Sequence, residues 1–260
     1  MKDVQNLKDN RGIKINEVGI SDLRIPLFIK SGRVRQQVVA CIKMGVDLFA
    51  NIRGIHMSRF MEIAEKVKNS EINDGMITKI LKEIKNRLNV NYSKVELSFT
   101  YFLTKKTPVS MKTCTSSYEC KIIGESGEDN TRWNYFEIIV PVSTLCPCSK
   151  EISKYGAHNQ RAEVLLKIKT KYYFKISEII KKIENESSGE LFSMLKRVDE
   201  KHVTEKMYDN PKFVEDVVRG IASWVMNDKR ITDFIVTCKS YESVHNHNAY
   251  AIIINEEDKC

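Results

Sequence analysis

The segment SKVELSFTYFL, Ser93 to Leu103, decides the fold class because its apolar residues recur at every second position. A period of two predicts a β-strand with one buried face. A hairpin partner is predicted around Ser117–Ile123, and the polar segment GESGEDN, residues 124–130, is the turn after it. The inward positions of the first strand are Val95, Leu97, Phe99, Tyr101 and Leu103.

Two strands and two helices are predicted before this hairpin. The strands are expected at Leu23–Lys30 and Val34–Phe49, joined by a turn at Ser31-Gly32. The segment GIHMSRF, residues 54–60, begins a helix whose spaced residues are Met57, Phe60, Met61, Ala64 and Val67. A second helix follows Asp74-Gly75, and its inward face is expected to hold Ile77, Ile80, Leu81, Ile84 and Leu88.

The second half of the chain repeats this order in kind. Strands are predicted at Trp133–Val142 and Arg161–Lys171, followed by a helix around Ile176–Ile183. Asn210-Pro211 is predicted to cap and start a further helix, with Val214, Val217, Val218, Ile221 and Val225 inward. The closing strands are expected at Ile231–Tyr241 and Ala249–Asn255.

Each half therefore has the order β-β-α-α-β-β, which favours an α+β architecture of antiparallel sheets. We expect an exposed N-terminal arm at residues 1–18, a first module at 19–128, and a second module at 129–260 that carries most of the active site. A four-stranded half leaves exposed sheet edges. An oligomer that continues the sheet into a barrel would remove them.

Composition narrows the function classes. The 260 residues are 42% hydrophobic, which argues against disorder. No apolar run approaches the roughly 18 residues that span a bilayer, and the polar start MKDVQNLKDNRG is unlike a signal peptide. We expect a cytoplasmic protein with no membrane partner. The net charge of +8 suggests an anionic partner, either nucleic acid or phosphorylated substrates gathered by an oligomer.

The seven cysteines are scattered and odd in number, which argues against a disulfide framework. Two of them, Cys146 and Cys148, belong to the segment LCPCSKEISKYGAHNQR, residues 145–161, with His158 in its second part. This set is typical of metal ligands or of a nucleophile with its base, while simple packing is the plainer interpretation. The residues SKEIS are predicted to form a short helix that favours a nearby thiolate.

Three further segments hold candidate residues. In YESVHNHN, residues 241–248, His245 and His247 are expected to point the same way, and Glu242 is suited to accept two N–H bonds from a guanine edge. The segment VDEKHVTE, residues 198–205, contains Glu200 in what resembles a solvated connection. GIHMSRF places Arg59 at a helix start, where phosphate binds readily.

Together these segments resemble the motifs of the GTP cyclohydrolase IB family. The matching strings are GIHMSRF, PVSTLCPCSKEISKYGAHNQR, VDEKHVTEKMYDNPKFVEDVVR, YESVHNHNAYA and the opening MKDVQNLKDNRGIKINEVGI. The resemblance implies a tunnelling fold with two tandem modules, assembled as a homotetramer with active sites between subunits. It implies an enzyme, a hydrolase that converts GTP to 7,8-dihydroneopterin triphosphate and formate. That reaction begins folate biosynthesis and, in many bacteria, the synthesis of queuosine-type tRNA bases.

The resemblance also implies roles for single residues. Cys146, His158, Glu200 and His245 match metal ligands, and Glu242 matches the glutamate that anchors guanine. Cys146, His158 and His247 are the expected catalytic residues, with His247 or His158 as proton donor. Arg59 and Arg161 are the expected phosphate-binding residues. Asn248 departs from the aspartate that is usual in the family.

One divalent ion is expected in each site. A mixed thiolate, imidazole and carboxylate set suits zinc first and tolerates manganese or iron.

Three rival interpretations stay open at this point. One is the archaeal-type, iron-dependent cyclohydrolase that yields a cyclic phosphate. Another is a basic nucleic-acid-binding protein with a structural metal, although no nucleic acid partner is expected. The third is a thiol redox protein using Cys146 and Cys148, for which a single intervening proline would strain the disulfide.

Overall fold

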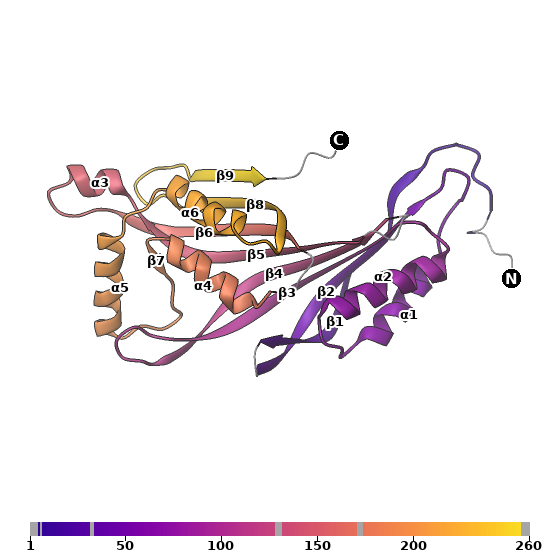
Figure 1. Ribbon diagram of the computed structural model, residues 1–260, viewed down its shortest axis with the longest axis horizontal. Coiled ribbons are helices and arrows are strands. Elements are labelled where there is room, and N and C mark those ends of the chain that lie inside the picture. The colour runs from indigo at the N-terminus through magenta and orange to yellow at the C-terminus, as the bar shows by residue number, and fades with distance from the viewer. Residues whose placement is uncertain (1–4, 6, 32–33, 128–131, 171–173, 256–260) are drawn as a thin grey trace. The chain divides into compact units, whose positions relative to one another are not determined.

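The structure is a computed structural model that describes residue 5 and residues 7–31, 34–127, 132–170 and 174–255. Within these residues the strands form a nine-stranded antiparallel sheet in the order β1-β2-β3-β4-β5-β6-β8-β9, with β7 paired to β5 (Figure 1). The strands are β1 (Ile15–Ser31), β2 (Val34–Leu48), β3 (Ser93–Lys106), β4 (Thr113–Ser126), β5 (Arg132–Leu145), β6 (Asn159–Thr170), β7 (Gly189–Glu190), β8 (Ile231–Ser240) and β9 (Ala249–Asn255).

Helices lie in pairs against the strands. In Figure 1, α1 and α2 run beside β1 and β2, and α4 and α6 run beside β5, β6 and β8. The helices are α1 (Met57–Val67), α2 (Asp74–Leu88), α3 (Pro147–Ile152), α4 (Ile176–Glu186), α5 (Arg197–Asp209) and α6 (Val214–Met226).

The core is formed by the apolar side chains that occupy every second position of the strands. In β3, Val95, Leu97, Phe99 and Tyr101 are at most 3% exposed, as the period of two predicts. The predicted inward face of α2 is buried along its whole length. Gly124 of β4 allows the close approach of this helix, since a Cβ there would lie 2.3 Å from Ile77 Cγ2.

The predicted elements are confirmed with shifted boundaries. Strand β1 begins at Ile15 rather than Leu23, and β4 extends into the predicted polar turn as far as Ser126. The rest of that turn beyond residue 127, and residue 32 of the predicted Ser31-Gly32 turn, lie outside the described residues. In α1, Met57 and Met61 are 38% and 43% exposed, so two of the five residues at helical spacing lie outside the buried face.

Two expectations near residue 200 are wrong. The segment VDEKHVTE is helical and belongs to α5, although it was expected to be a connection. Its hydrophobic pattern is weak because only Val203 and Met207 supply buried apolar side chains. Asn210 caps the C-terminus of α5 instead of starting α6, which begins at Val214 after the N-cap Phe213.

Internal contacts divide the chain into two compact units. One consists of residues 1–100, 121–136 and 171–173, and the other of residues 101–120, 137–170 and 174–260. The expected division between residues 128 and 129 stays a prediction. The predicted order β-β-α-α-β-β is wrong for the second half, because α3, β7 and α5 are inserted among its elements. Among the described residues, no helix is long and apolar enough to span a membrane.

Candidate functional site

The turn that links β5 to β6 carries Cys146 and His158. Cys146 is the N-cap of α3, and its Sγ accepts a hydrogen bond from Ser149 N at 3.4 Å. The Cys146 N–H donates to the His158 carbonyl at 3.1 Å, and the His158 N–H donates to Ser149 Oγ at 3.3 Å. The predicted short helix is thus confirmed. These bonds hold the backbones of Cys146 and His158 together across the turn.

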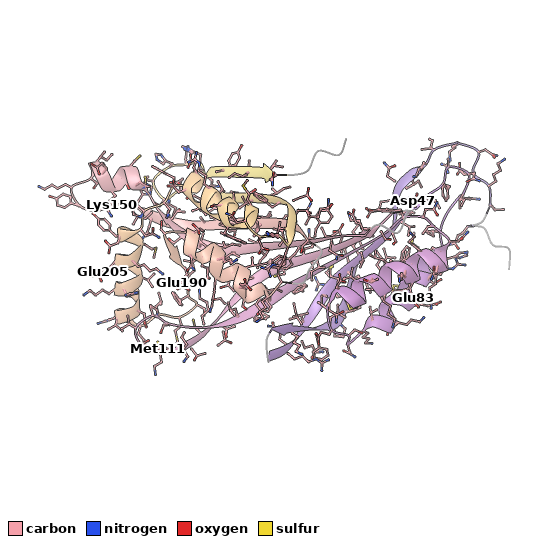
Figure 2. The ribbon with its side chains drawn as sticks, in the orientation of Figure 1. Asp47, Glu83, Met111, Lys150, Glu190 and Glu205 are labelled. Atoms are coloured by element: carbon pink, nitrogen blue, oxygen red, sulfur yellow. The ribbon has the colours of Figure 1, made fainter. Side chains whose placement is uncertain are left out.

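Helix α5 supports this turn from outside. Leu145, at the end of β5, is buried against Val203 and Met207 of α5, and Ala157 packs on the same cluster. Lys150 Nζ donates to the Tyr208 carbonyl at 2.5 Å, and Figure 2 shows Lys150 on α3 beside the helix that carries Glu205. The position of the thiol therefore depends on a helix more than fifty residues away in the chain.

A pocket of about 480 Å³ opens where β5 and β8 end and β6 begins, next to the start of α6. Four candidate residues line it: Cys146, Glu242, His245 and His247. The remaining lining residues are Thr144, Gln160, Lys212, Phe213, Val214, Glu215, Ser240, Asn248, Ala249 and Tyr250. The structure thus brings together residues from both of the most specific sequence segments.

The two histidines of the β8–β9 loop lie side by side. The ring centroids of His245 and His247 are 5.2 Å apart, and the ring planes differ by 24°. The prediction that they point the same way is confirmed, although the segment is a loop instead of a strand. Both side chains are exposed, so their ring nitrogens remain accessible from the pocket.

Glu242 begins the same loop and is held by one oxygen. Its Oε1 accepts a hydrogen bond from Ser240 Oγ at 2.8 Å. Its Oε2 has no hydrogen-bond partner among the residues that the structure describes. One carboxylate oxygen is therefore anchored and the other is left for a ligand.

Glu200 is not among the residues that line the pocket. It is exposed in the first turn of α5, next to the fully buried Asp199. Asp199 accepts hydrogen bonds from Val109 N, Ser110 N, Ser110 Oγ and Lys196 N at 2.6 to 3.1 Å. Burial opposes ionisation of Asp199, but these bonds outweigh it and hold its pKa well below the usual range. The buried carboxylate thus fixes the start of the helix that presents Glu200.

The expected metal ligands are suitable in chemistry but do not converge. In the described part of the chain, no group of three or more Cys, His, Asp or Glu side chains is placed to hold a metal ion. However, Cys146 and His245 line one pocket, and His158 is bonded to Cys146 through the backbone. A thiolate with imidazoles is a donor set that suits zinc. The residues fit such an ion by donor type, and the ligand set stays a prediction.

The predicted phosphate-binding arginines lie outside the pocket lining. Arg59 Nη1 donates to the Arg87 carbonyl at 2.6 Å within the first unit, and Arg161 is exposed at the start of β6. The pocket is lined instead by Lys212, which the sequence interpretation did not single out. Its signal was its place directly after Pro211, in the connection just before α6.

Comparisons with known proteins agree with this picture. A family model described as type I GTP cyclohydrolase folE2 matches residues 1–251. A GTP cyclohydrolase FolE2 of Pseudothermotoga lettingae is 44% identical over 99% of this chain and 100% of its own length. The FolE2 of Neisseria gonorrhoeae is 42% identical over 96% of this chain and 97% of its own.

Two solved structures resemble this chain in fold but not in sequence. Uricase from Arthrobacter globiformis has a TM-score of 0.51 at 7% identity, covering 94% of each chain. Urate oxidase from Bacillus subtilis 168 has a TM-score of 0.50, also at 7% identity, covering 92% of this chain and 97% of its own.

Proposed function

This chain belongs to the type I GTP cyclohydrolase folE2 family, and on that premise we propose that it hydrolyses GTP to 7,8-dihydroneopterin triphosphate and formate. Its relatives of the same length are named GTP cyclohydrolases, so the chain is an enzyme that acts on GTP. The observation that carries the proposed chemistry is the pocket shared by Cys146, Glu242, His245 and His247. The product would enter folate biosynthesis and also the synthesis of queuosine-type tRNA bases.

Glu242 would bind the guanine ring. A carboxylate can accept the two parallel N–H groups on the Watson–Crick edge of guanine, which are donors. Its Oε1 already accepts a bond from Ser240, which orients the carboxylate, and its Oε2 is available to the base. Holding the base in one orientation keeps C8 in place through two successive hydrolytic steps.

One divalent ion would be held by Cys146, His158 and His245, with Glu200 as a further ligand. Zinc fits this donor set, and manganese or iron are tolerated by it. When bound, the ion would act as a Lewis acid that makes water a better nucleophile at neutral pH.

The chain's own histidines would move the protons. Water adds to C8 of guanine, and the ring nitrogen that leaves must be protonated. His247 lines the pocket and stacks on His245, and His158 lies on the adjoining turn, so either imidazole is suited to donate this proton. A second hydrolysis releases C8 as formate. The opened ribose then rearranges and closes onto the freed amine with loss of water.

The triphosphate needs cations, for which we propose Lys212 beside Arg59 and Arg161. Lys212 lines the pocket, and its side chain forms no ion pair within the described residues. The net charge of +8 agrees with an anionic substrate.

We propose that the enzyme assembles as a homotetramer through its sheet edges. Among the strands that the structure describes, β9 pairs only with β8. On one of its faces, Tyr250, Ile252 and Ile254 are 72%, 50% and 60% exposed. An uncovered edge with exposed apolar residues favours pairing with another strand. Sedimentation of the wild type and of Ile252→Lys tests this: the variant should sediment as a smaller species. Equal sedimentation would exclude β9 from the interface.

Product analysis tests the reaction itself. The protein, reconstituted with zinc, manganese or iron, is incubated with GTP, and formate and a fluorescent pterin after oxidation are measured. A cyclic phosphate product, identified by mass, would favour the archaeal-type reaction. Absence of formate together with steeply salt-dependent RNA or DNA binding would favour the nucleic-acid alternative.

A further inference from the structure

A continuous chain of side-chain hydrogen bonds joins His158 to Glu242. His158 Nδ1 lies 2.8 Å from Gln160 Oε1, and Gln160 Nε2 donates to Thr144 Oγ1 at 3.0 Å. Thr144 Oγ1 lies 3.1 Å from Ser240 Oγ, which donates to Glu242 Oε1 at 2.8 Å. Three side chains therefore bridge two residues that the proposed function treats separately.

The bridging residues occupy positions where the strands are otherwise apolar. Residues of alternate number share one face of a strand, so each bridging residue continues a buried apolar row. The rows are Val140, Val142 and Thr144 on β5, Val164, Ala162 and Gln160 on β6, and Val236, Cys238 and Ser240 on β8. Thr144 and Ser240 are 2% and 1% exposed. Buried hydroxyl groups must be hydrogen-bonded. Within the described residues, the hydroxyls of Thr144 and Ser240 bond only to each other and to their neighbours in this hydrogen-bond chain, Gln160 and Glu242.

The direction of every bond follows from the carboxylate at one end. A carboxylate only accepts, so the single proton of Ser240 Oγ goes to Glu242. Ser240 Oγ must then accept the Thr144 proton, and Thr144 Oγ1 must accept from the Gln160 amide. That orientation turns Gln160 Oε1, a pure acceptor, toward His158. The Nδ1 atom of His158 must therefore carry a proton.

We propose that Gln160, Thr144 and Ser240 are positioning residues that use the Glu242 carboxylate to fix His158 as the Nδ1–H tautomer, with the Nε2 lone pair free. Ser243 Oγ, 3.4 Å from His158 Nδ1, is a second acceptor for the same N–H. A histidine binds a metal or accepts a proton through an unprotonated nitrogen, and the partner of its other nitrogen selects which one. The use of that lone pair in catalysis rests on the proposed function; the tautomer does not.

The test uses Thr144, because it is the member of the chain that contacts neither His158 nor Glu242. Thr144→Val keeps the shape and removes the hydroxyl, Thr144→Ser restores the hydroxyl, and Thr237→Val on β8 is the matched control. Spectra of the full-length enzyme labelled with ¹⁵N-histidine report which nitrogen of each of the five imidazoles is protonated. The signals of His158 are identified by their loss in His158→Asn.

We expect His158 to be protonated at Nδ1 in the wild type, in Thr144→Ser and in Thr237→Val. In Thr144→Val we expect a mixture of tautomers, a kcat about ten-fold lower, and zinc lost to a chelator about ten-fold faster, at the low end for outer partners of metal-binding histidines. KM for GTP should change by less than about two-fold, because Glu242 stays in place.

Protonation of His158 at Nε2 in the wild type would overturn the proposal. A Thr144→Val enzyme that matches Thr237→Val in tautomer, kcat and zinc retention would also overturn it. If Thr144→Val does not fold, Ser240→Ala breaks the same chain one residue later and is judged by the same criteria. If the wild type releases no formate from GTP, the proposed function fails, while the tautomer measurement still decides this inference.

Discussion

The strands of the two halves end differently beneath their helices. In the first half, the buried row of β2 is apolar to its last residue, through Met44, Val46 and Leu48. The buried Ser93 beside it bonds to its own helix, donating its Oγ to the Leu81 carbonyl at 3.2 Å. In the second half, the buried rows of β5 and β8 end in Thr144 and Ser240, which bond to each other and line a pocket.

The difference separates two uses of a buried hydroxyl. A hydroxyl that bonds to a helix carbonyl completes the packing of a strand on a helix. A hydroxyl that bonds to other side chains at a pocket wall orients groups that act on a ligand. Both are stable because both are hydrogen-bonded. Strand ends that pack against helices can thus complete the core in one half and line a pocket in the other.

The largest effect is expected when a cysteine of the second half is removed. Cys146→Ala should lose bound metal and lower formate release by more than about 100-fold, since a direct ligand should matter more than its outer partners. Circular dichroism should be unchanged. Cys41→Ala, a half-buried cysteine on β2, is the control and should keep both metal and activity. Wild-type formate release by Cys146→Ala would exclude the ligand role.

Removing the carboxylate of Glu242 should weaken GTP binding next most strongly. Loss of two charge-assisted hydrogen bonds predicts a roughly 100-fold higher KM for Glu242→Ala, with metal content unchanged. Glu62→Ala, an exposed glutamate on α1, is the control for loss of charge. Glu242→Ala protein without metal would point to a ligand role for Glu242 instead.

A lysine of the pocket should matter more than the arginine of the first unit. Lys212→Met should raise KM for GTP about ten-fold, the effect of losing one charge-assisted phosphate contact. Arg59→Met should raise it less, because its Nη1 is already bonded to the Arg87 carbonyl. A larger effect at Arg59 than at Lys212 would reverse this assignment of the phosphate contacts.

Most of the fold could be predicted because strand and helix periodicities are local. The row from Val95 to Tyr101 and the apolar face of α2 follow from the sequence alone. Helix α5 could not be predicted in this way, since its buried face has only two apolar residues and so gives no helical period in the sequence. The buried Asp199 that fixes its start bonds to residues 109 and 110, whose proximity is a product of the tertiary fold.

The site was only partly predictable, because some of its residues come together only through the tertiary fold. Cys146, Glu242, His245 and His247 belong to recognisable segments, and they do meet at one pocket. Gln160, Thr144 and Ser240 gave no signal of their own, because a threonine at the end of a strand is ordinary in sequence. Their role becomes visible only when three strands are laid side by side.

The buried Asp199 of the second unit should make the thermal stability of the protein depend on pH. Its folded pKa lies below the ordinary value of 3.8, so its ionised form favours folding. This stabilisation is complete above the ordinary pKa and is lost as the pH falls toward the lower folded value. The Tm of Asp199→Asn should be several degrees lower at pH 7 and should fall less steeply below about pH 4 than that of the wild type. Parallel Tm curves would show that the Asp199 carboxylate adds no pH dependence.

The smallest effects come from the two buried serines, and they test the comparison most directly. Ser93→Ala and Ser240→Ala each remove a buried hydroxyl, so each should cost about 1 kcal/mol and lower Tm by about 2–4 °C. Because Ser93 only completes packing on α2, its loss should leave kcat unchanged. Because Ser240 links His158 to Glu242 in the hydrogen-bond chain, its loss should lower kcat about ten-fold at the same Tm. Equal kcat values in the two variants would mean that the buried hydroxyls of both halves only stabilise the fold.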